Sequence, residues 1–424
     1  MLVEQHSVSE NRFYRLKLLI QRLGPGILMA TAAIGGSHLV ASTQAGAQFG
    51  WQLALLILAV NVFKYPFFRA GVSYTIATQQ TLQTGYAHMG KPYLLTSFAL
   101  NALVSFVNAA ALLLFSASLF SLFLPFSLPL PVIAGGLLAA MLLVLIAGHY
   151  HLLNQVAKFI MVALLIATVS ATLIAWQQGP VAPAGFESPS PWTLAAIGFL
   201  VVTMGWMPAP IEISGITSLW LKQQCQEQQV TASSALFDFN LGYFVTLLLA
   251  LVFLALGALV LHGSGEQLAT GGIGFSQQLV NLYASTIGEW SRYLIAVVAF
   301  LCIFGSAITV YDGYSRALAE CHSLLKGKSD IPENIYVGWL IWVSVMSFAI
   351  VLFFQSALLT MLGFAMTLAF VTTPMFAWLN YRLVQRANLP PELSGGKILL
   401  WLSRAGLVYL FGFLAVFIFW KWML

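Results

Sequence analysis

The sequence predicts an all-α polytopic membrane protein built from two inverted repeats of five helices and an eleventh helix. Three observations lead to this fold class. Hydrophobic residues make up 60% of the 424 positions and charged residues only 7%, far below the roughly 25% charged residues of soluble domains. Eleven apolar stretches are long enough to cross a membrane. The first and the sixth of them are broken in the middle by glycines or prolines.

The eleven stretches are separated by short polar connections. A helix needs about 20 apolar residues to cross a bilayer core about 30 Å thick. The stretches that meet this requirement run roughly over residues 24–47, 51–75, 93–124, 130–147, 153–176, 192–220, 235–262, 287–318, 335–354, 356–383 and 399–422. Because no connection is long enough for a soluble domain, residues 24–424 are expected to form a single transmembrane domain.

Basic residues predict how the chain is oriented. Residues 1–23 are rich in arginine and no small-residue cleavage site follows them, which indicates a cytoplasmic tail rather than a cleaved signal peptide. With this end inside, only Arg292 and Lys421 of the later lysines and arginines fall on the outside. The positive-inside rule therefore favours an integral plasma or inner membrane protein with its C-terminus outside. The lipid bilayer is its expected surrounding, and scattered basic residues give no sign of nucleic-acid binding.

The two breaks predict the location of a binding site. Glycine and proline weaken a helix by about 1 and 3 kcal/mol per residue, and unwound backbone at membrane depth persists only where protein or a cavity satisfies it. Paired breaks in two halves are typical of secondary transporters. The expected substrate-binding residues are Gly35, Gly36, Ser37, His38, Met207, Ala209, Pro210 and Glu212.

The spacing of the breaks indicates an inverted repeat. Five stretches separate their starts, and an odd number of crossings inverts the second unit relative to the first. The first repeat is predicted over residues 24–176, the second over 192–383, and the extra helix over 399–422. Substrate is expected to bind between the breaks and to be released by alternating access.

Two ionisable residues lie at the breaks. Glu212 follows Pro210 by two residues. Its carboxylate either caps the restarting helix or faces the cavity and binds a proton or cation; the two roles are compatible. His38 is either a hydrogen-bonded core residue or a substrate or proton site, since histidine titrates near neutral pH. Met207 is either a packing residue or a soft metal ligand.

Four further charges lie within apolar stretches. Such charges are costly unless paired and so are candidates for proton coupling or gating. Asp312 and Arg316 are four residues apart, on one helical face, and can pair. Lys64 lies deep in the second stretch and needs a partner. A network that joins Lys64 or Arg316 to Asp312 could be a gate or a static link between helices. Asp238, near the start of the seventh stretch, could be interfacial.

Several other classes of protein are disfavoured. The three cysteines have no metal-binding or disulfide spacing. There is no nucleophile triad, phosphate-binding loop or cofactor motif, so neither an enzymatic activity nor a cofactor is expected. We expect a monomer.

The breaks and their flanks resemble the Nramp family of proton-coupled divalent metal transporters. The similar runs are Gly24-Pro25-Gly26, Gln44-Ala45-Gly46-Ala47-Gln48-Phe49-Gly50 and Met207-Pro208. The resemblance implies a LeuT-type fold and protons as the coupling ion. It also implies metal binding by an Asp and an Asn at the first break and by a Met at the second.

The family's ligands are only partly present. Aligned through Gln44-Ala45-Gly46-Ala47, the Asp position falls on Gly35, the Asn position on His38 and the Met position on Met207. A tentative metal site would therefore consist of His38, Met207 and Glu212, which would favour a softer metal than manganese.

Two alternatives to metal transport stay open from the residues. Free amides at the half-helix starts suit a carboxylate, so the substrate could be a small organic solute such as a carboxylate or amino-acid-like compound, moved with protons. A membrane sensor is a remote alternative, because the Nramp fold also occurs in an ethylene-signalling protein of plants.

Overall fold

The computed structural model describes residues 24–147 and 150–423, and the predicted tail 1–23 lies outside them. All regular elements of this part are helical. The main helices are α2 (Pro25–Ile34), α3 (Thr43–Phe49), α4 (Ala54–Thr78), α6 (Lys91–Phe120), α7 (Leu130–Ile146), α8 (Tyr150–Gln178), α9 (Ile197–Trp206), α10 (Ile213–Glu227), α11 (Ala232–Val260), α13 (Arg292–Leu325), α14 (Glu333–Phe354), α15 (Leu358–Arg386) and α17 (Gly396–Met423). The shorter elements are η1 (Ser37–Ser42), α5 (Leu82–Met89), η2 (Ser121–Phe123), η3 (Leu194–Ala196), α12 (Gly272–Ile287), η4 (Glu289–Ser291) and α16 (Pro391–Ser394).

The eleven predicted stretches correspond to eleven helices or broken helix pairs in this part of the chain. By length and composition, seven single helices are able to cross a membrane, and α2 with the segment Ser37–Phe49 makes an eighth, bent by 44°. α7, α8 and the pair α9 and α10 occupy the fourth, fifth and sixth stretches. The prediction of an all-α polytopic membrane protein is confirmed.

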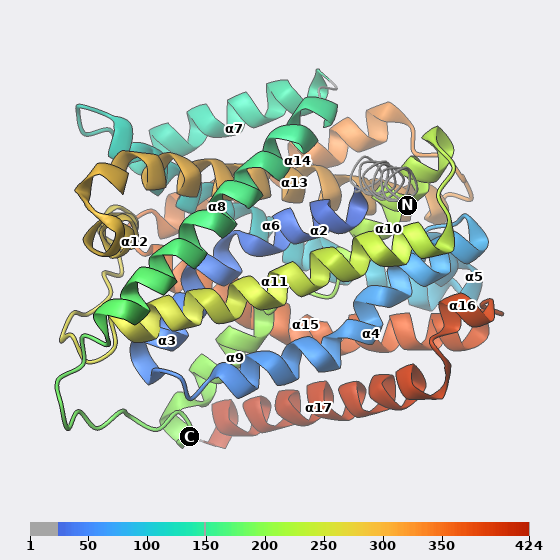
Figure 1. The fold of residues 1–424 in the computed structure, drawn as a ribbon. Helices are drawn as coiled ribbons and strands as arrows, with labels where there is room; N and C mark the ends of the chain where they lie inside the picture. The colour runs from blue at the N-terminus through green and yellow to red at the C-terminus, as the bar shows by residue number, and fades with distance from the viewer. Residues whose placement is uncertain (1–23, 148–149, 424) are drawn as a thin grey trace, which may run out of the picture.

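The two broken helices run in opposite directions through the bundle (Figure 1). α2 begins at the end of the bundle where α5 and α16 lie and leads through η1 to α3 at the other end. α9 starts near that other end, and α10 returns toward α5. α17 ends beside the start of α9, where the Trp420 ring packs on Gly198. This antiparallel course is what an inverted repeat requires of the first helix of each unit.

The first break is a bend rather than the unwound segment that was expected. α2 ends at Ile34, and the chain resumes at Ser37 as a π-helix, η1. Ser37 Oγ donates to the Ala33 carbonyl, and His38 Nδ1 lies 3.2 Å from the same oxygen. Side chains thus satisfy a carbonyl that the break exposes, which is how widened helical turns at functional sites can persist.

The second break is unwound as predicted. α9 ends at Trp206 and α10 begins at Ile213, with Met207–Glu212 in between outside any helix. Four helices enclose the two breaks: α6 packs along α13, α11 along α2 and α3, and α4 along α10. The breaks therefore face each other in the middle of the bundle.

Candidate functional site

The glycines of the first break leave room for two neighbouring side chains. A Cβ atom at Gly35 would lie 2.7 Å from Ser306 Oγ of α13, and one at Gly36 would lie 2.5 Å from the Trp206 ring. Real Cβ atoms do not approach other atoms this closely. Ser306 Oγ also donates to the Thr31 carbonyl in α2, at 2.7 Å. Gly35 and Gly36 thus allow α13 and the end of α9 to pack directly on the bend.

A small cavity lies between the two breaks. Its volume is about 30 Å³, enough for one or two water molecules. It is lined by Ala32, Ala33, Gly36, Ser37, Asn108, Leu112, Trp206, Pro210, Ile213, Val310 and Tyr314. Three of the predicted substrate-binding residues, Gly36, Ser37 and Pro210, therefore reach the cavity.

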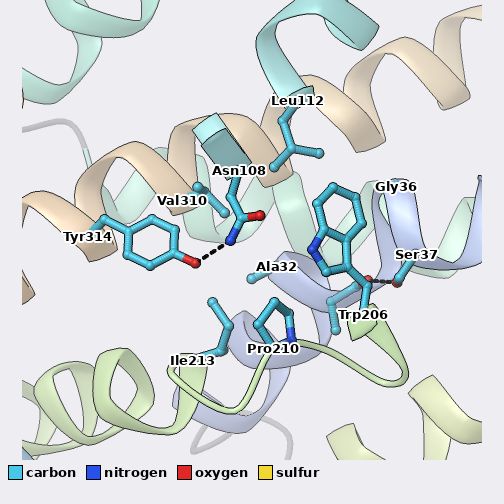
Figure 2. A pocket seen from close by; sticks show the side chains of 11 residues that line it. Ala32, Gly36, Ser37, Asn108, Leu112, Trp206, Pro210, Ile213, Val310 and Tyr314 are labelled. Carbon is cyan, nitrogen blue, oxygen red and sulfur yellow. Dashed lines mark hydrogen bonds between the residues drawn. The ribbon is translucent and has the colours of Figure 1, made fainter. Parts of the chain in front are cut away.

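Polar groups without partners face this cavity (Figure 2). Trp206 Nε1 and Asn108 Oδ1 are buried and have no hydrogen-bond partner in the described part of the chain. Figure 2 shows the indole nitrogen of Trp206 and the amide of Asn108 turned toward the same space. Buried polar atoms normally find partners. One donor and one acceptor are thus available to a molecule between the breaks.

A hydrogen-bonded chain joins the cavity wall to Glu212. Asn108 Nδ2 donates to the Tyr314 hydroxyl at 2.7 Å, and that hydroxyl donates to Glu212 Oε1 at 3.0 Å. Glu212 is only 2% exposed, and its Oε2 lacks a partner among the described residues. Asn108 and Tyr314 were missed in the sequence because they carry no charge; their polar character inside long apolar stretches is the available signal.

Lys64 binds the carbonyl oxygens at the second break. Its side chain is completely buried, and Nζ donates to Met204, Gly205 and Ala209 carbonyls at 2.8, 3.0 and 3.2 Å. Its charge also attracts the Glu212 carboxylate. Of the two networks considered, which joined Lys64 or Arg316 to Asp312, the structure has the one with Arg316 and places Lys64 against the backbone around the second break.

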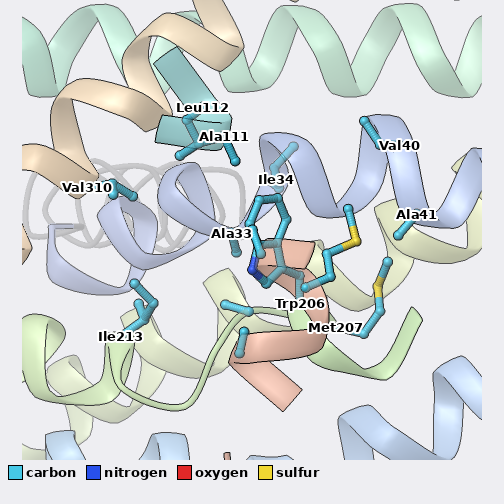
Figure 3. Packing of buried hydrophobic residues seen from close by; sticks show 14 of the residues in the cluster. Ala33, Ile34, Val40, Ala41, Ala111, Leu112, Trp206, Met207, Ile213 and Val310 are labelled. Atoms are coloured by element: carbon cyan, nitrogen blue, oxygen red, sulfur yellow. The ribbon is translucent and has the colours of Figure 1, made fainter. Parts of the chain in front are cut away.

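His38 and Met207 lie outside the set of residues that lines the cavity. His38 Nε2 is 2.8 Å from the Thr246 carbonyl of α11, and Nδ1 is 2.6 Å from Ser37 Oγ. Met207 Sδ accepts from Ser42 Oγ at 3.7 Å. Figure 3 shows Met207 among buried apolar residues of both breaks. In this conformation each of the two is a buried residue with its own local partner.

The structure contains no preformed metal cluster in its described part. No group of three or more histidine, cysteine, aspartate or glutamate side chains converges there. His38 is bonded toward α11, and Glu212 toward α13. His38, Met207 and Glu212 are thus each bonded to a different neighbour in this conformation: the Thr246 carbonyl, Ser42 Oγ and the Tyr314 hydroxyl.

Asp238 caps the first half-helix. Its carboxylate accepts from the backbone N–H groups of Gly24 and Gly26, at 3.2 and 2.7 Å. Asp238 is 5% exposed, so its side chain is buried within the protein. A carboxylate at a helix N-terminus satisfies free amides and the positive end of the helix dipole. It thus joins α11 to the start of α2.

Asp312 and Arg316 pair as their spacing predicts. Arg316 Nε donates to Asp312 Oδ1 at 2.8 Å, and the Tyr336 hydroxyl of α14 donates to the same oxygen at 2.8 Å. The Arg316 guanidinium also lies over the Tyr336 ring, 4.7 Å from its centre. The pair therefore holds α13 against α14.

A larger pocket, which we name the vestibule, lies between the ends of α10 and α13. Its volume is about 410 Å³. It is lined by Leu219, Trp220, Lys222, Gln223, Gln226, Glu227, Arg316, Glu320, Ser329, Asp330 and Ile331. Ile216 of α10 packs on Gly313 of α13, where a Cβ atom would lie 2.5 Å from the isoleucine. On α10, Ile216 lies in sequence between Ile213 of the cavity and Leu219 of the vestibule. On α13, Gly313 directly precedes Tyr314 of the cavity wall.

Comparison with known proteins identifies the family and the fold of this chain. A model of the natural resistance-associated macrophage protein-like family matches residues 26–420. A Pasteurella multocida protein, described as uncharacterized, is 48% identical over 399 residues, which cover 93% of this chain and 91% of the relative.

Solved structures show the same fold at low identity. A mutant of the Eremococcus coleocola manganese transporter is 14% identical, with a TM-score of 0.62 over 96% of this chain and 95% of that one. MhsT in complex with L-phenylalanine is 12% identical, with a TM-score of 0.66 over 93% and 98% of the two chains. The predicted LeuT-type fold with five-plus-five inverted repeats is confirmed.

Proposed function

Because the chain belongs to the natural resistance-associated macrophage protein-like family, the Nramp family of membrane transporters, we propose that it carries a divalent metal ion across the membrane with protons. The similarity in fold to a manganese transporter supports this substrate class. Membership of a transporter family agrees with the expectation that the protein is not an enzyme and requires no cofactor.

The single observation that carries the transport proposal is the cavity between two opposed breaks. Residues of α2, α6, α9, α10 and α13 line it, and Ile216 of α10, between Ile213 of the cavity and Leu219 of the vestibule, packs on Gly313 of α13. Under the predicted orientation the vestibule opens to the cytoplasm. Alternating access would then require α10 to move away from α13, which would join the cavity to the vestibule.

Binding of a metal ion requires a rearrangement of the proposed ligands. Glu212 supplies the negative charge that the family places at the position of Gly35. His38 would have to leave the Thr246 carbonyl and Met207 would have to leave Ser42 for the three groups to meet. Imidazole, thioether and carboxylate together favour a borderline metal ion over manganese.

Protons are proposed to be carried by Glu212 or His38. Within residues 24–147 and 150–423, one oxygen of Glu212 has no hydrogen-bond partner, and the other is linked through Tyr314 to the cavity wall. A carboxylate of this kind can take up a proton when the bound cation leaves. Lys64, Asp238, Asp312 and Arg316 then have structural or gating roles around this exchange.

A small organic solute is the second candidate substrate, because of the cavity lining. Apolar side chains make up most of it, and Trp206 Nε1 and Asn108 Oδ1 supply a donor and an acceptor that no described residue pairs with. Ligand sites for organic molecules combine a mostly apolar wall with a few such polar groups. The family supports the metal ion, whereas the lining supports this alternative.

Transport in liposomes tests the proposal. Purified protein is reconstituted, and uptake of manganese, cadmium, cobalt and zinc ions is followed with and without an inward proton gradient. Gradient-driven uptake of one ion supports the proposal, whereas no uptake across the series, with binding of small carboxylates in calorimetry, favours the organic solute.

The matched variants are Glu212→Gln and Glu227→Gln. Glu227 lies in the vestibule wall at the end of α10, outside the cavity. Glu212→Gln should abolish the pH dependence of uptake, whereas Glu227→Gln should leave it intact. Unchanged pH dependence in Glu212→Gln would remove Glu212 from the proton pathway.

A further inference from the structure

The ammonium group of Lys64 is surrounded by backbone carbonyl oxygens, as a metal cation bound by a protein backbone would be. Its ammonium is completely buried, and its three N–H donors meet three carbonyl oxygens between 2.8 and 3.2 Å. Two of these oxygens belong to the last turn of α9 and the third to the unwound segment after it. Donor number and acceptor number match, so the ammonium is fully satisfied by backbone alone.

The three carbonyls form a site that attracts cations. The last carbonyls of a helix have no partner within it, and they carry the negative end of the helix dipole. In transporters with broken helices, half-helix C-terminal ends and unwound carbonyls coordinate the coupling cation. Met204, Gly205 and Ala209 present such oxygens here, at the end of the half-helix α9.

Glu212 provides the opposite charge nearby. It lies three residues after Ala209, at the start of α10, and its charge and that of Lys64 attract each other. An unpaired charge at this depth would be strongly unfavourable. The lysine therefore satisfies two needs at once, since it fills the carbonyl site and compensates the carboxylate.

We propose that the Lys64 ammonium is a tethered cation that occupies a cation site formed by the Met204, Gly205 and Ala209 carbonyls, in place of a free coupling ion. The site accepts a primary ammonium or a small alkali cation when the lysine side chain is removed. Consequently, transport by the unaltered protein needs no sodium. The inference rests on the proposed function for its role in transport, but binding at the site is measured without any transported substrate.

Chemical rescue of Lys64→Ala tests the proposal. This change removes three carbons and the ammonium, which n-propylammonium supplies again. We expect the purified full-length variant to melt at a lower temperature than the unaltered protein and to recover in a saturable manner with n-propylammonium. Tetramethylammonium, which has no N–H donor, and n-propanol, which has no charge, should not restore the melting temperature.

Lys64→Met and Lys91→Ala are the matched controls. Methionine keeps most of the stem and fills the space that n-propylammonium would enter, so this variant should not respond to the amine. Sodium should stabilise Lys64→Met relative to the same concentration of choline. Lys91 is exposed at the start of α6, and its alanine variant should melt like the unaltered protein.

The outcomes separate this proposal from the function proposed above. Equal responses of Lys64→Ala to n-propylammonium, tetramethylammonium and n-propanol would overturn the cation site, whatever the protein transports. If Lys64→Ala cannot be purified, the double variant Lys64→Ala with Glu212→Gln removes both charges and keeps the carbonyls. A folded double variant without a response to n-propylammonium would also overturn the proposal, and failure of metal uptake alone would leave it standing.

Discussion

The Tyr314 hydroxyl of α13 donates a hydrogen bond of 3.0 Å to the Glu212 carboxylate, which lies just before α10 begins. A residue in the middle of one long helix is thereby bonded to the restart of a broken one. Asn108 of α6 completes the chain through the same hydroxyl. Three helices that are distant in sequence thus meet at one buried carboxylate.

Removal of this hydroxyl should weaken the site. Tyr314→Phe deprives Glu212 of its donor, and a hydrogen bond to a charged group contributes about 1.5–3 kcal/mol. We expect a lower melting temperature and slower substrate uptake. Tyr311→Phe is the control, because Tyr311 is equally buried in α13 but its hydroxyl bonds the neutral Ser347 hydroxyl. Equal losses in the two variants would show that Glu212 gains nothing specific from Tyr314.

We expect Gly35→Asp, which restores the family's aspartate, to destabilise the protein unless a second residue is also changed. Gly35→Asp would bring a Cβ atom within 2.7 Å of Ser306 Oγ and 3.0 Å of Ser306 Cβ. Overpacking of this kind costs about 1–3 kcal/mol, and the buried carboxylate adds to it. The double variant Gly35→Asp with Ser306→Gly should express and melt closer to the unaltered protein, although it loses the bond to Thr31. Thermal unfolding measures both, and a well-folded single variant would contradict the crowding at Gly35.

The double variant also tests the metal site. An aspartate at position 35 returns an anionic ligand to the first break, next to the cavity. If the transported substrate is a divalent metal ion, the folded double variant should bind manganese more tightly than the unaltered protein in calorimetry. Unaltered affinity would indicate that no metal ion binds within reach of position 35.

Loss of the carboxylate cap should destabilise α2. Asp238→Asn replaces a charged acceptor for Gly24 and Gly26 amides by a neutral one, and helix N-caps contribute about 1 kcal/mol, up to 2. We expect a modest drop in melting temperature without a change in the pH dependence of uptake. Asp330→Asn, at an exposed residue, is the control. A changed pH dependence in Asp238→Asn alone would return Asp238 to the proton pathway.

We expect the pair of Asp312 and Arg316 to be a fixed structural contact between α13 and α14, and not a gate. Asp312 accepts hydrogen bonds from Arg316 and from Tyr336 of α14. Asp312→Asn should lower the melting temperature by weakening both, with the KM of uptake unchanged, because neither residue lines the cavity. A large change in KM at unchanged melting temperature would identify the pair as a gate.

Much of the fold was predictable from the sequence because the membrane imposes simple constraints. Stretches of about 20 apolar residues with short connections must be helices that cross the bilayer. Glycine and proline pairs in two such stretches, five apart, predicted both the broken helices and their inversion. The pairing of Asp312 with Arg316 also followed from helical spacing alone.

The partners of the buried charges could not be predicted, because they come from helices far apart in the sequence. Lys64 binds backbone carbonyls, which every residue carries and no sequence pattern distinguishes. Tyr314 and Asn108 reach Glu212 only once α6, α10 and α13 are packed together. Composition and periodicity determined how many helices there are and where they break. Tertiary packing decided which side chains face the cavity, and it turned His38 toward Thr246 of α11.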